Sequence, residues 1–279
     1  MINKTPAETK VFITGASSGI GAATALLLAQ KGYQVWGTTR DLAKVKKLPV
    51  ELQTKVKFIK LDLTDDASAK QGVAEFLSQS GGEVDILINN AGCNVFGPVE
   101  EYSLEKAKEI FNLNYFGPLR LIQALVPFMR EKRSGLIINV SSLAGIFVIP
   151  FQVQYSATKF SLEALTEGLR QELRPFGVKV VAVEPGDIKT LTNENTVFDM
   201  KPDTPYKKWA NRCWKTIEDN LEKAPGPSVV AHTIYRIIQK RNPRTRYTSG
   251  DPLSRAFPAI NRFVSSRVKE FLIRVFYNI

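Results

Sequence analysis

Histidine and cysteine are nearly absent from this sequence of 279 residues. The only histidine, His232, lies in an apolar helical pattern, so we interpret it as structural. This argues against a Ser-His-Asp triad and against a histidine-rich metal site. The two cysteines, Cys93 and Cys213, are far apart and lack metal-ligand spacing. We therefore predict no metal site and no disulfide scaffold, which fits a reducing cytoplasm.

Long hydrophobic runs are also missing, and acidic residues are the minority among the charged ones. No run approaches the length of a membrane-spanning helix, and residues 1–10 carry no apolar signal segment, so we expect a cytoplasmic protein. The net charge of +11 favours anionic partners such as a phosphorylated cofactor, nucleic acid or acidic lipid. Because the chain has no nucleic-acid-binding motif, we do not expect a nucleic-acid partner.

Short β-rich runs alternate with helical patterns along most of the chain. Strands are expected at Lys10–Thr14, Gln34–Thr39, Val56–Leu61, Val84–Asn89, Gly135–Val140, Val178–Val183 and, more weakly, Arg246–Ser249. Helices are expected at Ile20–Lys31, Ala67–Ser78, Leu104–Arg130 and Tyr155–Arg174. This alternation predicts one α/β domain over residues 1–279, with a doubly wound parallel sheet covered by helices on both faces.

Polar and glycine-rich residues follow four of these strands at the point where each strand ends. The segments are Thr14 to Gly21, Asn89 to Gly92, Ser141-Ser142 and Pro185-Gly186. Ligands of open α/β sheets bind outside the carboxyl ends of the strands. The sequence therefore predicts one binding site at that edge of the sheet.

Three glycines stand between the first strand and the first helix. Gly15, Gly19 and Gly21 allow a tight turn and a close approach of backbone N–H groups to a pyrophosphate. Their spacing is GxxxGxG rather than the common GxGxxG. In this strand-turn-helix context the pattern predicts nucleotide binding.

The end of the second strand indicates which nucleotide binds. Thr39 occupies the position where an NAD site places an acid, and Arg40, which follows, can pair with a 2′-phosphate. Asp41 is expected to cap a helix over Leu42–Leu48. We therefore predict NADP(H) in preference to NAD(H). Asp62, after the third strand, can reach an adenine amino group or cap the next helix, and both alternatives stay open.

A phenol and an ammonium four residues apart form the expected chemical centre. Tyr155 and Lys159 lie on one face of a helix, where the cation can lower the phenol pKa by roughly 1–3 units. Pro118 has no N–H, so the carbonyl of Asn114 is free to hold a water. The hydroxyl of Ser142 can donate to a substrate oxygen or orient the phenol. Each residue alone also has an ordinary structural explanation.

Together these motifs resemble the short-chain dehydrogenase/reductases, from about Val11 to Thr190. The resemblance implies a Rossmann-type fold with about seven strands and an Asn114-Ser142-Tyr155-Lys159 tetrad. Tyr155 would be the general acid/base, Ser142 would polarise the substrate oxygen, Lys159 would hold the nicotinamide ribose, and Asn114 would anchor a relay water. Besides Tyr155 and Lys159, the resemblance and the motifs above imply cofactor contacts at Gly15, Ser17, Ser18, Gly19, Ile20, Gly21, Arg40, Asp62, Leu63, Asn90, Ala91, Gly92, Pro185, Gly186, Ile188 and Thr190.

The resemblance implies an oxidoreductase that interconverts a carbonyl and an alcohol by hydride transfer. The segments Tyr155–Arg174 and Pro185 to Thr190 are most similar to the branch of 17β-hydroxysteroid dehydrogenases, retinol dehydrogenases and acyl-dihydroxyacetone-phosphate reductases, so we expect a hydrophobic substrate. The alternative is a non-catalytic NADPH-binding or sensing protein. Relatives are often dimers or tetramers, so we expect a homo-oligomer.

Two segments lie outside the common pattern. Residues 191–227 are expected to form a substrate loop, in which Trp209, Cys213 and Trp214 either cover a greasy substrate or pack on the core. Residues 255–279 are expected to form a basic amphipathic helix. Its apolar positions are Ile260, Val264, Val268, Phe271, Leu272 and Val275, and its basic ones are Arg262, Arg267, Lys269 and Arg274. That helix either packs on the domain or a second subunit, or makes peripheral contact with a membrane.

Overall fold

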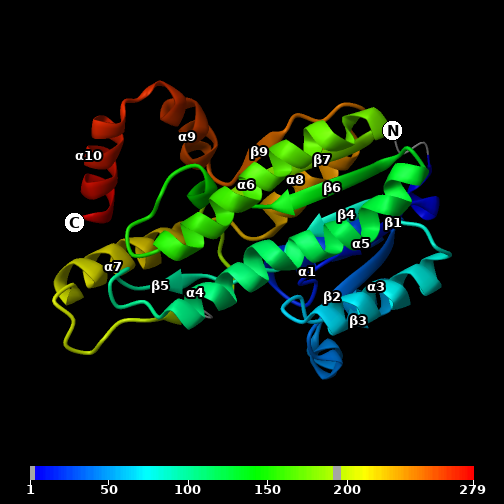
Figure 1. The fold of residues 1–279 in the computed structure, drawn as a ribbon, viewed down its shortest axis with the longest axis horizontal. Coiled ribbons are helices and arrows are strands. Elements are labelled where there is room, and N and C mark those ends of the chain that lie inside the picture. Colours follow the sequence, from blue (N-terminus) through cyan, green and yellow to red (C-terminus); the bar gives the residue numbers. More distant parts are fainter. Residues whose placement is uncertain (1–3, 191–195) are drawn as a thin grey trace.

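Seven parallel strands form the central sheet of this computed structural model, which describes residues 4–190 and 196–279 (Figure 1). The strands are β1 (Lys10–Ile13), β2 (Gln34–Thr39), β3 (Lys57–Lys60), β4 (Ile86–Asn89), β6 (Gly135–Val140), β7 (Val178–Pro185) and β9 (Arg246–Ser249). Two further short strands, β5 (Val95–Phe96) and β8 (Val197–Phe198), pair with each other. The predicted seven-stranded doubly wound sheet is confirmed.

Helices cover both faces of the sheet (Figure 1). They are α1 (Gly19–Gln30), α2 (Val50–Lys55), α3 (Asp66–Ser80), α4 (Leu104–Phe111), α5 (Gly117–Glu131), α6 (Val153–Leu173), α7 (Lys207–Lys223), α8 (Ser228–Ile238), α9 (Pro252–Phe263) and α10 (Ser266–Tyr277). One apolar layer contains Leu28 of α1 and Ile234 of α8. The other contains Phe76 of α3, Leu121 of α5 and Leu169 of α6. Since both faces are covered, the central strands are continuous apolar runs.

The strand order, β3-β2-β1-β4-β6-β7-β9, reverses direction between β1 and β4. β1 pairs with β2 on one side and with β4 on the other. Such a reversal leaves a crevice beyond the carboxyl ends of the two strands, where ligands of this architecture bind. The fold therefore brings the turn after β1 and the loop after β4 to one place.

The structure differs from the sequence prediction in two helical regions. The helix expected over Leu104–Arg130 is divided by a π-helical turn, Asn112–Phe116, and Pro118 lies in the first turn of α5, where a missing N–H costs little. The helix expected over residues 255–279 is two helices, α9 and α10, with extended backbone at Ser265 between them. No helix in the described ranges is both long enough and apolar enough to cross a membrane.

Candidate active site

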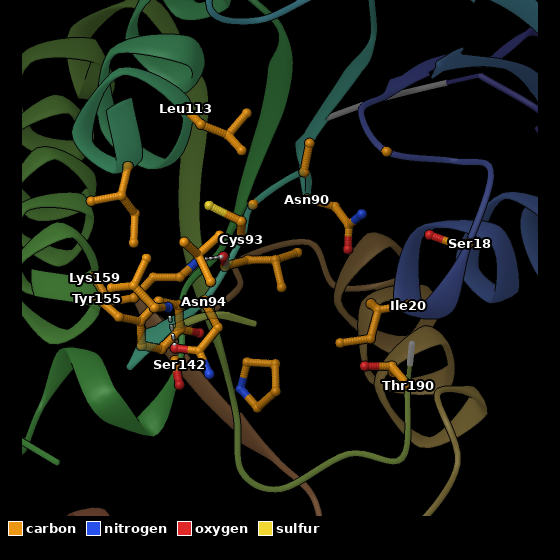
Figure 2. Close-up of a pocket in the computed structure, with 18 of the residues that line it drawn as sticks. Ser18, Ile20, Asn90, Cys93, Asn94, Leu113, Ser142, Tyr155, Lys159 and Thr190 are labelled. Carbon is orange, nitrogen blue, oxygen red and sulfur yellow. Dashed lines mark hydrogen bonds between the residues drawn. The ribbon is translucent and has the colours of Figure 1, made fainter. Parts of the chain in front are cut away.

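A cavity of about 1120 Å³ lies at the carboxyl ends of the strands. The predicted site residues that line it are Gly15, Ser17, Ser18, Ile20, Arg40, Leu63, Asn90, Ala91, Gly92, Ser142, Tyr155, Lys159, Pro185, Gly186, Ile188 and Thr190. Figure 2 shows Ser18 and Ile20 on one side of this cavity, with Tyr155 and Lys159 on the other. The structure thus brings the nucleotide motifs and the chemical motifs to one cavity.

The glycine turn after β1 requires its glycines for conformation and for space. Gly15 and Gly19 have φ angles of 67° and 53°, in the left-handed region that favours glycine. A Cβ on Gly21 would lie 2.2 Å from the carbonyl oxygen of Gly15. Neither Gly19 nor Gly21 lines the cavity, but both shape the turn. Because α1 begins at Gly19, its first N–H groups have no partner within the helix, and such a turn fits a pyrophosphate.

Hydrogen bonds fix the loop after β4 against this turn. The hydroxyl of Thr14 accepts from the backbone N–H groups of Asn90, at 2.9 Å, and Ala91, at 3.0 Å. The side-chain amide of Asn90 donates to the carbonyl of Thr14 at 2.9 Å. These contacts connect the two strands that border the crevice.

Three cations line the cavity at the end of β2. Arg40 was predicted there, whereas Lys44 and Lys47 were not. The carboxylate of Asp41 accepts from the N–H of Ala43 at 2.8 Å and caps a 3₁₀ helix over Leu42–Lys47, which confirms its predicted capping role. The cluster suits a phosphate group on the cofactor ribose.

Asp62 does not cap the helix that follows it, and its side chain bonds to Thr64 instead. Its carboxylate accepts from the backbone N–H of Thr64 at 2.9 Å and from its hydroxyl at 2.7 Å, and these two bonds lower its pKa against the effect of desolvation, the largest single influence. The cap of α3 is Asp65, so the capping alternative is wrong. Asp62 does not line the cavity, and its predicted adenine contact stays a prediction.

Tyr155 and Lys159 both project from the first half of α6 toward the cavity (Figure 2). Lys159 is 4% exposed, and its Nζ donates to the carbonyl of Val140 at 3.0 Å. This Nζ lies 5.7 Å from the centroid of the Tyr155 ring. Ser142 follows β6, and its hydroxyl accepts from the N–H of Ala144 at 3.1 Å. The phenol, ammonium and hydroxyl therefore gather at one end of the cavity.

Burial displaces the pKa values of both ionisable groups. It raises the pKa of Tyr155 to about 12, against the opposing effect of a hydrogen bond with Ser142. It lowers the pKa of Lys159 to about 8. The sequence predicted a lowered phenol pKa, and the structure reverses that direction because desolvation outweighs every favourable interaction. At neutral pH the phenol is therefore protonated and able to donate its proton.

Asn114 stands behind the cavity and holds its wall. Its Nδ2 donates to the carbonyl of Cys93 at 3.0 Å and to the hydroxyl of Thr158 at 3.1 Å, and its Oδ1 accepts from the N–H of Cys93 at 3.0 Å. A Cβ on Gly92 would lie 3.1 Å from that Oδ1 and 3.7 Å from Nζ of Lys159. The amide thus joins the loop after β4 to α6. Its relay water stays a prediction.

A buried polar ladder below the site was not predicted from the sequence. Nδ2 of Asn89, on β4, donates to Oδ1 of Asn139, on β6, at 2.9 Å. Nδ2 of Asn139 donates to the hydroxyl of Thr166, on α6, at 2.9 Å. Only the position of these residues on apolar strands could have indicated such a role. The ladder fixes the helix that carries Tyr155 against the two central strands.

The far end of the cavity is mixed in character. It is lined by Ile149, Gln152, Val197, Ile217, Asn220, Leu221 and Tyr277. Gln152 is 3% exposed. Tyr277 comes from the last turn of α10. Val197, Ile217, Asn220 and Leu221 lie in the segment 191–227 that was predicted as a substrate loop. Gln152 and Tyr277 were not predicted, because sequence alone does not show that Gln152 faces the cavity or that the C-terminal helix reaches it.

The helix α7 contributes to this end, but not through the predicted residues. Cys213 is fully buried in an apolar cluster with Phe96 and Tyr277, and the ring of Trp214 packs edge-on against Phe96 at a centroid distance of 5.0 Å. Trp209 is 41% exposed and does not line the cavity. Core packing is thus the role of Cys213 and Trp214. Residues 191–195 of the predicted substrate loop lie outside the described residues.

Comparisons with known proteins agree with this geometry. Residues 9–201 match the family model of the short chain dehydrogenases. The chain is 34% identical over 271 residues to a 3-ketodihydrosphingosine reductase of Bacteroides thetaiotaomicron, covering 96% of this chain and 98% of that protein. The crystal structure of a short-chain dehydrogenase from Streptomyces avermitilis is similar with a TM-score of 0.81 and 31% identity, covering 98% and 96%. A metagenomic short-chain oxidoreductase in complex with NADP gives a TM-score of 0.70 and 25% identity, covering 88% and 98%.

Proposed function

This chain belongs to the short-chain dehydrogenase/reductase family and is an oxidoreductase, and from that premise we propose that it interconverts a carbonyl and an alcohol with NADP(H). The observation that carries the proposal is the position of Tyr155 and Lys159 at one end of a cavity that also contains the glycine turn. When bound, the nicotinamide supplies or accepts the hydride. The residues of the chain bind the cofactor, orient the substrate and exchange the proton.

Each residue of the centre has a distinct role in this proposal. Tyr155, whose pKa is about 12, holds a proton at neutral pH and donates it to the oxygen of the carbonyl substrate. Ser142 hydrogen-bonds the phenol and orients it. The Lys159 ammonium stabilises the phenolate that is left after proton transfer. Asn114 positions the loop and the helix that hold these groups.

Replacement of Tyr155 by Phe tests this function. We expect turnover to fall by about 10²–10⁴-fold, because general acid assistance is lost while the ring remains. NADPH oxidation with a panel of ketones and aldehydes measures the loss, and fluorescence titration with NADPH checks that the cofactor still binds. Tyr235→Phe, on α8 and outside the cavity, is the control. Full activity in Tyr155→Phe would overturn the assignment, and NADPH binding by the wild type without turnover of any carbonyl would favour the sensor alternative.

Three observations support a preference for NADP(H). Arg40, Lys44 and Lys47 line the cavity, and no acid stands at the position of Thr39. The metagenomic relative of similar structure is a complex with NADP. A guanidinium that pairs with a 2′-phosphate favours the phosphorylated cofactor.

The far end of the cavity supports a hydrophobic substrate. Ile149, Ile217 and Leu221 line it together with Tyr277, and Gln152 and Asn220 supply polar contacts beside them. The Bacteroides relative is named for the reduction of a 3-ketodihydrosphingosine. A long-chain ketone with a polar group near the carbonyl is therefore the class of substrate that we favour, and peripheral contact with a membrane would suit such a substrate.

We also propose a homo-oligomer. The outer surfaces of α4 and α6, with the π-helical turn beside them, expose apolar side chains. They are Leu104, Phe116, Val153 and Phe160. Apolar side chains in such number on neighbouring elements are typical of an interface between subunits.

A further inference from the structure

The helix α10 directs its apolar face outward. Val268, Phe271, Leu272 and Val275 are 47–61% exposed and recur at intervals of three and four residues, which places them on one side of the helix. Phe276 extends this stripe, and Phe263, at the end of α9, is 84% exposed beside it in the chain. We call these six residues the outward stripe. A surface helix of a soluble protein normally presents polar residues in this direction.

The opposite face of α10 is already used for packing. Ile273 and Tyr277, one turn apart, belong to the apolar cluster that contains Cys213 and Ile217 of α7. Figure 1 shows α10 as a separate arm beyond α9 and above α7. The outward stripe therefore lies outside the core of the chain, and its α10 residues expose one apolar face, which marks an interaction site.

Cations border the outward stripe on both sides. Arg267 and Arg274, seven residues apart, lie along one edge, and Lys269 lies along the other. None of the three forms an ion pair with a residue in the described part of the chain. The one acidic residue of α10, Glu270, is exposed and lies on the Arg267 and Arg274 side of the helix, outside the outward stripe. Apolar residues flanked by cations are the pattern of a helix that lies in the interface of an anionic membrane.

We propose that the outward stripe docks α10 on the surface of an anionic lipid bilayer. The stripe enters the boundary between headgroups and acyl chains, and Arg267, Lys269 and Arg274 contact lipid phosphates. A second copy of this chain fits the surface less well, because a two-fold contact between identical stripes brings the same cations together. The lipid surface supplies the opposite charge.

The docked helix is also a wall of the cavity. Tyr277 lines the cavity from the packed face of α10, so the bilayer lies about one helix diameter, ~10 Å, from that wall. The tail is attached to the active-site loops as well. The rings of Phe257 and Phe147 lie 4.4 Å apart, and a Cβ on Gly186 would lie 2.3 Å from the hydroxyl of Ser254. The docked helix can deliver a substrate that is dissolved in the bilayer, and this part of the inference rests on the proposed function.

Flotation of the full chain with vesicles tests the docking. The vesicles contain phosphatidylcholine with about 30% phosphatidylglycerol, and vesicles of phosphatidylcholine alone are compared. We expect the wild type to float with the anionic vesicles and to be released by high salt. Phe271→Glu/Val275→Glu should lower the bound fraction by about tenfold or more. Val50→Glu, which introduces one such charge at a 74% exposed position on α2, should have no effect.

Two further measurements separate docking from folding and from catalysis. The double variant should bind NADPH and reduce a small water-soluble ketone as the wild type does. If it fails to fold, Arg267→Gln/Arg274→Gln, with the stripe intact, should still weaken binding to anionic vesicles severalfold. Equal flotation of the folded variants and the wild type, or no flotation of the wild type, would overturn the docking. So would a change of oligomeric state in the double variant without wild-type flotation, which would assign the stripe to a second copy. Flotation without turnover of any carbonyl would overturn only the proposed function.

Discussion

Tyr155 and Lys159 lie side by side with pKa values displaced in opposite directions. Burial favours the neutral form of each, so the phenol gains affinity for its proton and the ammonium loses it. The phenol pKa of about 12 keeps the phenol protonated over the physiological range. The lysine pKa of about 8 means that the ammonium loses its charge in mildly alkaline solution. The centre therefore suits carbonyl reduction near neutral pH.

The buried ammonium of Lys159 should lower the stability of the fold. Its pKa of about 8 lies below the ordinary value of 10.5, so at pH 7 the folded state holds the proton at a cost of up to about 3 kcal/mol. We expect Lys159→Met to be more stable than the wild type at pH 7. The difference should shrink between pH 8 and pH 10.5, where the wild-type lysine loses its proton in the folded state first.

Urea unfolding of both proteins across this pH range measures the effect. Lys70→Met removes an exposed lysine of α3 and is the control. A constant difference between Lys159→Met and the wild type at all pH values would show that the ammonium carries no such cost. The variant should also lose turnover at every pH, because the phenolate loses its neighbouring charge.

Arg40 should set the choice of cofactor. We expect Arg40→Asp to lower the ratio of kcat/KM for NADPH over NADH by about tenfold or more, since the ion pair with the 2′-phosphate is replaced by repulsion. Steady-state kinetics with both cofactors measures the ratio. Arg241→Asp makes the same charge change outside the cavity. An unchanged ratio in Arg40→Asp would assign the preference to Lys44 and Lys47 instead.

Among single residues, most of those predicted from a short sequence motif line the cavity or shape its glycine turn. The glycine turn, Arg40 and the pair Tyr155 and Lys159 each have a local spacing that indicates their role. Lys44, Gln152 and Tyr277 have none, because they reach the cavity only through the path of the folded chain. The phenol pKa was predicted in the wrong direction because a sequence does not show how deeply a helix is buried.

Among the elements, α1 can begin where it does only because residue 21 is a glycine, since a methyl group there would clash with the preceding turn. A Cβ on Gly21 would lie 2.2 Å from the carbonyl oxygen of Gly15 and 2.5 Å from Nδ2 of Asn90. We expect Gly21→Ala to weaken NADPH binding by about tenfold and to lower the free energy of unfolding by about 1–3 kcal/mol, because the start of the helix must move.

Gly168, in α6, is the matched control for this prediction. A Cβ there would meet no atom within 4 Å, so Gly168→Ala should raise stability by about 0.5–1 kcal/mol and leave NADPH binding unchanged. Cofactor titration and thermal unfolding distinguish the two glycines. Similar behaviour of both variants would contradict the role of the tight turn.

The bounds of several strands were predicted correctly, whereas the interruptions within two predicted helices were not predicted. β2 and β6, which are almost wholly buried, have the predicted bounds, and so does the more weakly predicted edge strand β9, which is only partly buried. The π-helical turn at Asn112–Phe116 and the break at Ser265 were missed. The residues on either side of each keep a helical period, so the sequence carries no signal for a change of helix type or direction.

For the whole molecule, the exposed apolar side chains around α6 lead to a prediction about assembly. We expect light scattering on a sizing column to give a multiple of the chain mass. Phe160→Glu, at a 41% exposed position on α6, should dissociate the oligomer because it buries a charge in the interface. Phe263→Glu, on α9, should not change the mass. A monomeric wild type would contradict the proposed assembly.

The ladder of Asn89, Asn139 and Thr166 also bears on how the chain finds its fold. Side chains alternate between the faces of a strand, so a slip of one residue between β4 and β6 would turn one amide to the opposite face of the sheet and leave the other without this partner. Each unpaired buried amide would cost about 1–3 kcal/mol. A misaligned sheet formed early in folding is therefore less stable than the native pairing. The three polar side chains that hold α6 in place thus also favour the correct alignment of β4 and β6.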